Sequence, residues 1–196
     1  MRVFVIAMEC EAGCVRPFLR PEDRLIVCGI GKVNAAAAAQ RAISEYGADL
    51  IINAGLAGGF GADMNPGEVY EVSAAVEYDF DLAKLNGTAA GVLDEYDTPY
   101  LEVESTGAFP GAILATGDRF NDSEGDYALI RDELKATLRD MEGAAVAHVC
   151  RKNGVRCRMV KCVTNVAGKG SMTGQYENNR ELALGRLAAA MKSYIG

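Results

Sequence analysis

A carboxylate at position 142 stands where α/β proteins commonly bind their ligands. Glu142 lies between a short strand-like run and an Ala-rich stretch that favours a helix. Open α/β sheets bind ligands outside the carboxyl ends of their strands, where the next helix begins. Glycine and alanine follow Glu142, so no bulky side chain would crowd a substrate there. The sequence therefore predicts that this carboxylate faces a ligand.

Two more carboxylates, Glu9 and Glu11, follow the first apolar run of the chain. If the chain stays extended there, residues two apart point to the same side. Burying two carboxylates at a strand end is costly unless they have a role. Taken alone, these residues indicate solvated charges as readily as a catalytic acid or base.

Two glycine-containing segments could present backbone N–H groups to a ligand. Residues 53–59 (NAGLAGG) end a strand-like run with three glycines, which favours a binding loop over a plain turn. Gly29 and Gly31 precede a helical stretch that begins at Lys32, as in a phosphate-binding turn. The third glycine of the dinucleotide fingerprint is missing, so we favour close packing of a turn there.

Phe120 and His148 each allow a functional and a structural interpretation. Phe120 follows a strand-like run, where its ring could stack on a base or fill the core, and the sequence favours the core. His148 lies in the helical stretch after Glu142, among Ala and Val residues. We interpret it as a packed helix residue rather than a catalytic base.

These residues need a scaffold that brings distant segments together. Apolar runs typical of buried strands alternate with stretches that favour helices, which indicates an α/β sandwich. The predicted strands cover residues 3–8, 24–28, 50–53, 68–76, 111–116 and 158–164. The predicted helices cover residues 32–46, 127–137, 143–152 and 179–194.

Residues 77–110 differ from the rest of the chain. They are rich in Asp, Glu, Tyr and Gly and show no clear period. An irregular stretch of this length in a compact domain is often a functional lid or a partner-facing loop. A solvated insertion is an equally weighted alternative.

Length and charge narrow the class of protein. The chain has 196 residues, of which 49% are hydrophobic and 24% charged, as is typical of a compact folded protein. We expect one domain spanning residues 1–196. The formal net charge of −7 argues against nucleic acid or an anionic membrane as the main partner. A small molecule is the favoured partner.

The cysteines favour a reducing compartment. They are scattered through apolar runs of a chain without a secretory leader, so we expect free thiols in a cytoplasmic protein. The pair Cys10 and Cys14 is spaced like half a metal site, but the chain has a single His and no second pair. No metal is expected. The N-terminal apolar run is too short for a membrane span.

Six segments, taken in order, resemble the nucleoside phosphorylase and nucleosidase superfamily, and most of all its 5′-methylthioadenosine/S-adenosylhomocysteine nucleosidases. They are IAMECE (6–11), GIGKVNAA (29–36), NAGLAGG (53–59), GDRF (117–120), DMEGAA (140–145) and TNVA (164–167). The resemblance implies a three-layer α/β sandwich in which helices flank a central mixed sheet, as in purine nucleoside phosphorylases. It also implies a homodimer.

The resemblance further implies roles for individual residues. Glu11 resembles the general base that activates water, and Glu142 resembles the carboxylate that binds the ribose hydroxyls. Met141 would lie beneath the sugar, Phe120 would stack on the base, and Asn165 would face the imidazole edge of the purine. The other expected substrate contacts are Ala7, Ile30, Ala57, Gly58, Asp140, Lys161 and Thr164.

The implied reaction is hydrolysis of a purine N-glycosidic bond. Positive charge builds on the ribose while the departing base gains negative charge, so the site must stabilise both ends. Glu142 would oppose the charge on the ribose, and Glu11 would take a proton from the attacking water. No metal or organic cofactor is required.

Three residues depart from the nucleosidase pattern. Thr164 and Asn165 replace a Ser-Asp pair, and an amide cannot hand a proton to purine N7. An Asn suits a 6-oxopurine, because its NH₂ can donate to O6 or N7 while its carbonyl accepts from N1–H. Leu56 replaces a Ser that helps to position water in the nucleosidases.

Two alternative functions follow from these departures. A phosphorylase is the enzymatic alternative, although Glu11 favours water over phosphate as the nucleophile. A nucleoside-binding relative without activity is the other, because Leu56 and Asn165 are altered. Phosphate binding would require a cluster of cations, for which the candidates are Arg24, Lys32, Arg119 and Lys161.

Overall fold

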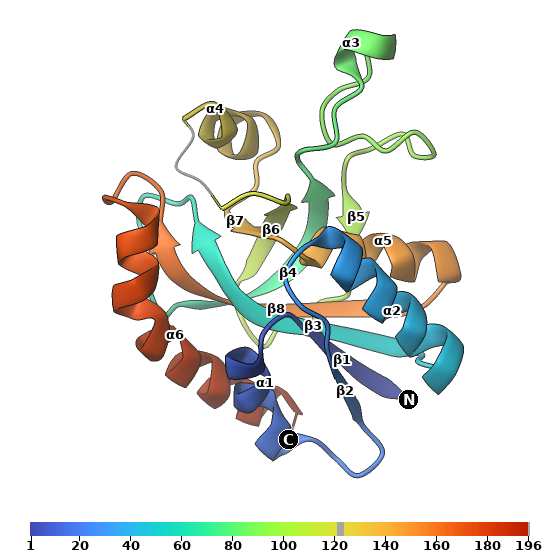
Figure 1. Ribbon diagram of the computed structural model, residues 1–196. Coiled ribbons are helices and arrows are strands. Elements are labelled where there is room, and N and C mark those ends of the chain that lie inside the picture. The colour runs from blue at the N-terminus through green and yellow to red at the C-terminus, as the bar shows by residue number, and fades with distance from the viewer. Residues whose placement is uncertain (121–123, 196) are drawn as a thin grey trace.

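A central mixed sheet organises the computed structural model, which describes residues 1–120 and 124–195 (Figure 1). The strands of the described chain are β1 (Arg2–Ile6), β2 (Arg24–Val27), β3 (Leu50–Gly59), β4 (Val69–Glu77), β5 (Leu101–Glu102), β6 (Gly111–Thr116), β7 (Leu138–Asp140) and β8 (Arg156–Val166). They follow the order β2-β1-β3-β7-β6-β4-β5, and β8 pairs with both β3 and β4. The path β3-β7-β6-β4-β8 therefore closes on itself.

Both parallel and antiparallel pairs contribute to this sheet. The pairs β1–β2, β1–β3, β3–β8, β4–β6 and β6–β7 are parallel, whereas β3–β7, β4–β5 and β4–β8 are antiparallel. The longest run of pairing joins β3 to β8, with a shift in register between Ala57 and Gly58. This irregularity lies at the strand end that reaches the site described below.

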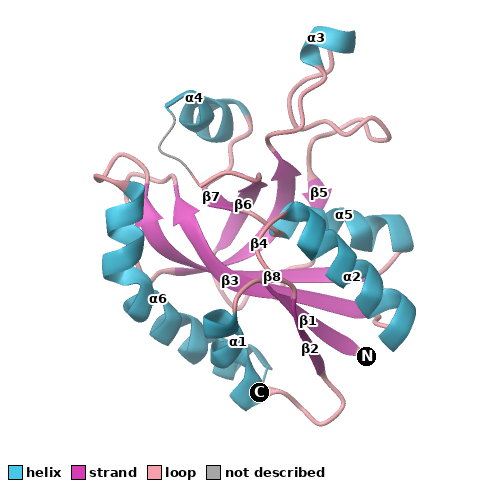
Figure 2. Cartoon of the chain, in the orientation of Figure 1, coloured by secondary structure: helices cyan, strands magenta, loops and turns pink. Residues whose placement is uncertain are grey.

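Helices cover both faces of the sheet (Figure 2). On one face α2 (Lys32–Tyr46) packs against α5 (Gly143–Asn153), and on the other α1 (Glu9–Val15) packs against α6 (Met172–Ile195). Each face has its own apolar core, one around Ile51 and Val146 and the other around Phe4 and Leu187. The predicted α/β sandwich with a mixed central sheet is confirmed.

Glycine ends both helices of the α2 and α5 layer. Gly47 follows α2 with φ 62°, and Gly154 follows α5 with φ 64°. This left-handed conformation is accessible to glycine at little cost, and each N–H bonds a carbonyl of the last helical turn. Both ends agree with the predicted helix limits to within a residue.

The predicted limits were wrong at four places. The chain turns into α1 directly after Met8 instead of remaining extended, and β3 continues through the glycines to Gly59 instead of forming a loop. In place of the predicted helix 127–137, the chain forms α4 (Glu124–Tyr127) followed by a π-helical turn (Ala128–Glu133). The helical part ends early because Thr137 already forms a backbone hydrogen bond with the sheet. Helix α6 begins seven residues before the predicted start, at Met172.

The irregular segment 77–110 contains α3 (Ala83–Asn86) and the short β5, which pairs with β4 at the edge of the sheet, and its α3 part extends away from the sheet (Figure 1). Ion pairs attach the beginning of this segment to the face that carries α2 and α5. Lys32 Nζ lies 2.6 Å from Asp79 and 3.2 Å from Glu77, and His148 lies between Glu77 and Glu95. The segment is thus fastened next to the N-terminus of α2.

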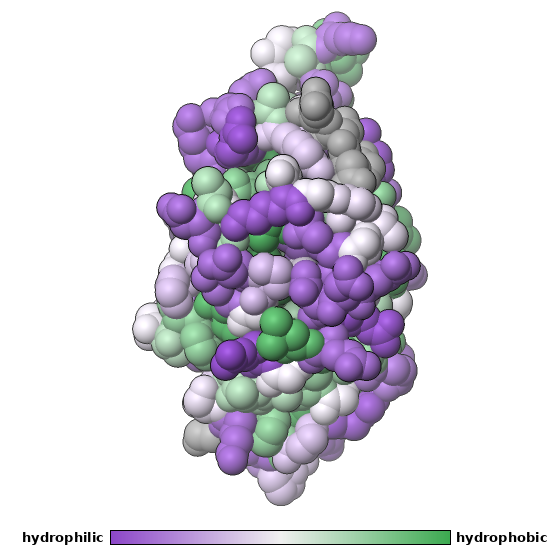
Figure 3. Space-filling model, turned by 90° about the vertical axis from the view of Figure 1, so that its left-hand side faces the viewer, coloured by the Kyte–Doolittle hydropathy of each residue, from purple (hydrophilic) through white to green (hydrophobic). Residues whose placement is uncertain are grey.

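The face that carries α6 is mainly hydrophilic, with small hydrophobic patches (Figure 3). This agrees with a helix that buries one side, including Ala183, Leu187 and Met191, and exposes the other. No helix in the described parts of the chain combines the length and apolar character that crossing a bilayer requires.

Candidate active site

A cavity of about 310 Å³ opens at the edge of the sheet where β1, β3, β7 and β8 end. Strand ends of this kind are where α/β sheets bind ligands, and the volume suits a small molecule. Its lining is formed by Ala7, Met8, Glu11, Ile30, Leu56, Ala57, Gly58, Phe120, Arg139, Asp140, Met141, Glu142, Thr164, Asn165 and Tyr176. The predicted site residues, apart from Lys161, are therefore brought together on one wall or another.

Glu11 enters the cavity from the first turns of α1, with only 3% of its surface exposed. Its Oε1 accepts a hydrogen bond from Leu56 N (2.8 Å) and its Oε2 accepts one from Met8 N (3.1 Å). Burial raises the pKa of Glu11, and these N–H groups together with Lys161 oppose that rise. The carboxylate is held from two sides and is more basic than a solvated one.

The helix separates the two glutamates that an extended chain would have kept together. Glu9 is exposed and pairs with Arg16 at 2.8 Å, whereas Glu11 is buried. The expectation that both carboxylates point the same way is wrong, because residues two apart lie on different sides of a helix. Glu9 is a solvated charge.

The carboxylate of Glu11 occupies the space that a side chain at position 55 would need. A Cβ added to Gly55 would lie 2.7 Å from Glu11 Oε1. We predict that Gly55→Ala displaces this carboxylate and lowers kcat/KM roughly 10²-fold, because misplacement by about 1 Å can cost that much. Steady-state rates and circular dichroism would check the loss of activity and the retained fold.

Gly13→Ala is the matched control, since Gly13 lies in the same helix as Glu11 and nothing is within 4 Å of its added Cβ. This variant should keep the wild-type rate. Equal losses in the two variants would contradict the proposed conflict with Glu11.

Glu142 faces the cavity from the start of α5 and is 7% exposed. Its Oε1 accepts a hydrogen bond from Gly31 N at 2.8 Å, so the turn before α2 serves this carboxylate. Burial raises the pKa of Glu142 to about 7, and Asp140 adds to the rise, while Lys161 and Gly31 N–H oppose it. Near neutral pH this carboxyl exists in both protonation states.

Asp140 organises the residues behind Glu142. Its Oδ1 accepts a hydrogen bond from Thr116 Oγ1 (2.6 Å), and its Oδ2 accepts one from Gly143 N (2.9 Å) and lies 2.7 Å from Lys161 Nζ. Thr116 Oγ1 in turn accepts from Ala144 N (2.9 Å). The first turn of α5 is thereby fixed to β6 and β8.

Lys161 was expected to contact substrate, but the structure places it behind Asp140. It is 2% exposed and does not belong to the cavity lining described above. The difference arises from position along β8: Lys161 lies in the middle of the strand with its ammonium group held by Asp140, whereas β8 contributes to the lining only near its end, at Thr164 and Asn165.

Asn165 has a defined orientation at the end of β8. Its Oδ1 accepts a hydrogen bond from Thr164 Oγ1 (2.5 Å), and its Nδ2 lies 3.3 Å from Met172 Sδ and close to Gly58. A side chain of α6 supports this strand end, since Asn179 Nδ2 donates to the backbone carbonyl of Thr164 (3.0 Å). The amide N–H side of Asn165 is thus directed away from Thr164.

An aromatic pair borders the cavity. Phe120 is 50% exposed, and its ring centroid lies 5.8 Å from that of Tyr176 in an edge-on arrangement. The expectation that Phe120 fills the core is wrong. Tyr176 was not foreseen because it precedes the predicted start of the last helix, and the sequence likewise did not single out Met8 or Arg139.

The family model of the phosphorylase superfamily matches residues 24–196. The chain belongs to this superfamily. The 5′-methylthioadenosine/S-adenosylhomocysteine nucleosidase of Bacillus pumilus (strain SAFR-032) is 34% identical over 180 residues, which cover 83% of this chain and 78% of that protein. The nucleosidase of the same name from Bacillus cereus (strain G9842) is 30% identical over 179 residues, with the same coverage. The resemblance indicated by the sequence motifs is confirmed.

Solved structures show the same fold at lower identity. The Helicobacter pylori 5′-methylthioadenosine/S-adenosylhomocysteine nucleosidase has a TM-score of 0.88 at 20% identity, covering 100% of this chain and 97% of that one. The futalosine hydrolase of Helicobacter pylori strain 26695 has a TM-score of 0.88, also at 20% identity and with the same coverage. The architecture is therefore that of the phosphorylase superfamily throughout the chain.

The four cationic side chains considered for binding phosphate already interact with carboxylates or carbonyls of this chain. Lys32 pairs with Glu77 and Asp79, and Lys161 pairs with Asp140. Arg24 bonds the carbonyls of Pro21 and Asp23, and Arg119 lies 3.8 Å from Asp126. In the described residues, no group of three or more His, Cys, Asp and Glu side chains is arranged to hold a metal ion.

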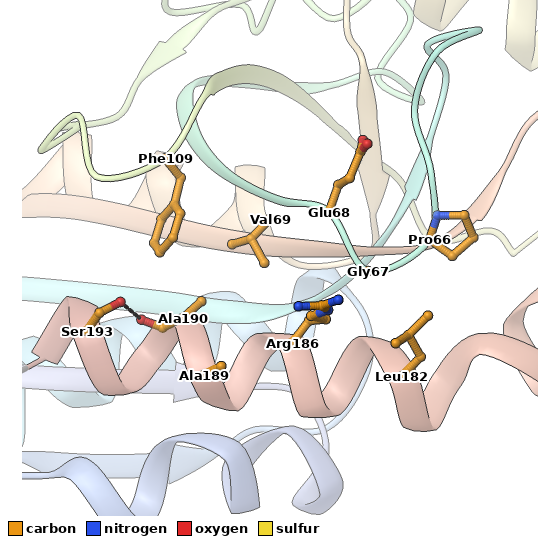
Figure 4. A pocket seen from close by; sticks show the side chains of 10 residues that line it. All are labelled: Pro66, Gly67, Glu68, Val69, Phe109, Leu182, Arg186, Ala189, Ala190 and Ser193. Atoms are coloured by element: carbon orange, nitrogen blue, oxygen red, sulfur yellow. Dashed lines mark hydrogen bonds between the residues drawn. The ribbon is translucent and has the colours of Figure 1, made fainter.

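A second cavity, of about 490 Å³, lies between α6 and residues 66–69 (Figure 4). Leu182 and Arg186 approach it from α6, and Phe109 and Val69 from the opposite side. Glu68 points away from α6 and already accepts hydrogen bonds from Tyr70 and Asn65. Two buried glutamates line the first cavity, and among the described residues no such pair lines this one.

Proposed function

We propose that this chain is a purine-nucleoside N-glycosidase that hydrolyses the bond between ribose and base. One observation carries the proposal: two buried carboxylates, Glu11 and Glu142, come from different helices to the wall of one cavity. Burial of such groups is costly and is kept where chemistry uses it. The nucleosidase names of the curated relatives agree with this reaction.

In the proposed mechanism, Glu142 accepts hydrogen bonds from the 2′- and 3′-hydroxyls and opposes the positive charge that builds on the ribose. Glu11 takes a proton from water while the water oxygen bonds to the anomeric carbon. The bond from that carbon to the base nitrogen breaks, and its electron pair leaves with the base. We assign Phe120 and Tyr176 to the face of the base.

We further propose that the site prefers 6-oxopurines over adenine. One amide N–H of Asn165 donates to Met172 Sδ and the other is left for O6 or N7, while its oxygen accepts from Thr164 and keeps one further lone pair for N1–H. An adenine leaving as a neutral base needs a proton at N7, which an amide cannot supply. A base that departs as a stabilised anion is better suited to this site.

The function is tested by incubating the purified protein with methylthioadenosine, S-adenosylhomocysteine, inosine and a futalosine-like nucleoside, and measuring the released base by chromatography. We expect release from the 6-oxo members above all. Adenine release at equal or higher rate would contradict the preference, and binding without release of any base would show a nucleoside-binding relative instead.

The same assay separates hydrolysis from phosphorolysis. We expect ribose as the sugar product and rates that do not depend on added phosphate, because the candidate cations are paired with carboxylates or carbonyls. Strict dependence on phosphate, with ribose 1-phosphate as the product, would refute hydrolysis.

Restoring an acid at position 165 should broaden the specificity. We predict that Asn165→Asp raises kcat/KM for adenine nucleosides about 10²-fold, since general acid catalysis contributes roughly 10²–10⁴-fold. The rate for inosine should not gain in parallel. Rates for both substrates, measured side by side, check this, and an unchanged ratio would contradict a role for Asn165 in base selection.

Cytoplasmic location and assembly into a homodimer remain predictions from the sequence. The same holds for the expectation that residues 1–196 form one domain.

A further inference from the structure

A buried ammonium group lies directly behind the wall of the cavity. Lys161 stands in the middle of β8, opposite Gly55 of β3 and Tyr70 of β4, and is 2% exposed. Its Nζ is 2.7 Å from Asp140 Oδ2, a carboxylate whose side chain is 1% exposed. Because desolvating a charge is expensive, a lysine at this depth requires a compensating reason to remain.

The charges of three carboxylates act on this one ammonium group. Burial lowers the pKa of Lys161, but the charges of Asp140, Glu142 and Glu11 outweigh burial and leave it raised. Lys161 therefore stays positively charged at neutral pH. Asp140 holds it by direct contact, so the other two carboxylates feel its charge without being bonded to it.

The two carboxylates of the proposed mechanism depend on this charge. Burial raises the pKa of Glu142 and that of Glu11, Asp140 raises both further, and Lys161 lowers both. Two further charged groups face the same cavity: Glu11 also raises the pKa of Glu142, and the buried Arg139 belongs to the lining. Gly31 N–H donates to Glu142, and burial together with Glu142 raises the pKa of the Cys28 thiol to about 11, so that thiol stays neutral.

We propose that Lys161 is a positioning residue for the hydrolysis: held by Asp140, it supplies the counter-charge that lets Glu142 and Glu11 face the substrate as carboxylates. This inference rests on the proposed function of the same cavity. Lys161 does not touch the substrate, because Asp140 keeps its ammonium group away from the ribose hydroxyls that Glu142 would bind.

Two substitutions should move the titration of Glu142 in opposite directions. Lys161→Met removes the favourable charge, so the acid limb of kcat/KM should move to higher pH by about one unit or more. Asp140→Asn removes the unfavourable charge and keeps a polar group for Thr116 and Gly143, so the limb should move to lower pH. Lys161→Arg keeps the positive charge and should restore a profile close to that of the wild type.

A readout that needs no turnover separates this inference from the proposed function. Carboxyl ¹³C NMR of glutamate-labelled protein, assigned with Glu142→Gln, would follow the titration of Glu142 in each folded variant. Opposite shifts in Lys161→Met and Asp140→Asn would support the proposal even if no nucleoside were cleaved.

Unchanged titration midpoints, or an equal loss of rate at every pH, would overturn the proposal in favour of a purely structural Lys161. If Lys161→Met failed to fold, Asp140→Asn and Lys161→Arg would still decide the question. A lower titration midpoint of Glu142 in Asp140→Asn, together with an unchanged midpoint in Lys161→Arg, supports the counter-charge, and any other result refutes it.

Discussion

A Glu142→Gln variant is expected to lose roughly 10²–10³-fold in kcat/KM, the usual effect of removing one group that stabilises transition-state charge. Glutamine fills the same space, and its carbonyl oxygen can still accept the hydrogen bond from Gly31 N. What disappears is the negative charge opposite the ribose. The loss should therefore appear in kcat rather than in the fold.

The same substitution should raise thermal stability at neutral pH. The pKa of Glu142 is about 7 in the folded chain, against an ordinary value of 4.5. Between these pH values the folded state keeps a proton that the unfolded state releases, so the free energy of unfolding falls as pH rises. Glutamine has no such penalty, and the gain should be on the order of 1–3 kcal/mol above pH 7 and vanish below pH 4.5.

Melting curves of Glu142→Gln and the wild type at pH 4.5 and pH 8 test whether the variant is more stable only at the higher pH. Each kcal/mol of added stability should raise Tm by about 2–4 °C. Glu71 is the matched control of opposite sign. Although burial raises its pKa, hydrogen bonds from Thr106 and Ser105 lower it to about 2. Glu71→Gln should therefore destabilise the protein at pH 8.

Wild-type turnover in Glu142→Gln would remove Glu142 from the mechanism.

The wild-type pH profile follows from the same carboxyl. The ionised form of Glu142 accepts hydrogen bonds on both oxygens and opposes the positive charge of the ribose ring, whereas protonation removes the charge and turns one oxygen into a donor. Turnover at low substrate concentration should then fall as the pH drops below about 7. In Glu142→Gln this limb should be absent from the residual activity.

The architecture could be predicted because its signals are local. Strand β6 agrees with its predicted limits, and helices α2 and α5 end within a residue of theirs, since glycine follows each. The errors occurred where tertiary contacts outweigh local pattern. Gly55, Gly58 and Gly59 resemble a loop in sequence, yet β3 continues through them because small residues leave room for Glu11, Asn165 and Met64.

The sequence indicated which residues line the cavity better than it indicated how they are arranged there. Motif order brought Glu11, Glu142 and Asn165 to attention, and these residues do line one cavity. The depth of Lys161 depends on how far along β8 the cavity reaches and on its ion pair with Asp140, and the contribution of Tyr176 depends on where α6 begins. Neither is determined by residues adjacent in the sequence.

The hydrolytic step should depend most strongly on Glu11. Glu11→Gln removes the group that would take a proton from water, and we expect kcat to fall roughly 10²–10⁴-fold. KM should change little, because the ribose and base contacts that we propose belong to Glu142, Phe120 and Asn165. The single oxygen of glutamine can still accept from Leu56 N, which keeps the side chain tied to β3, while the hydrogen bond from Met8 N is lost.

Glu9→Gln is the control for this prediction, because Glu9 lies in the same helix two residues away and is solvent-exposed. It should turn over at the wild-type rate. Single-turnover measurements of base release for both variants separate the chemical step from product release. A Glu11→Gln variant as fast as Glu9→Gln would show that water is activated elsewhere in the cavity, and the presence of two buried glutamates in its lining would then have to be explained by ribose binding alone.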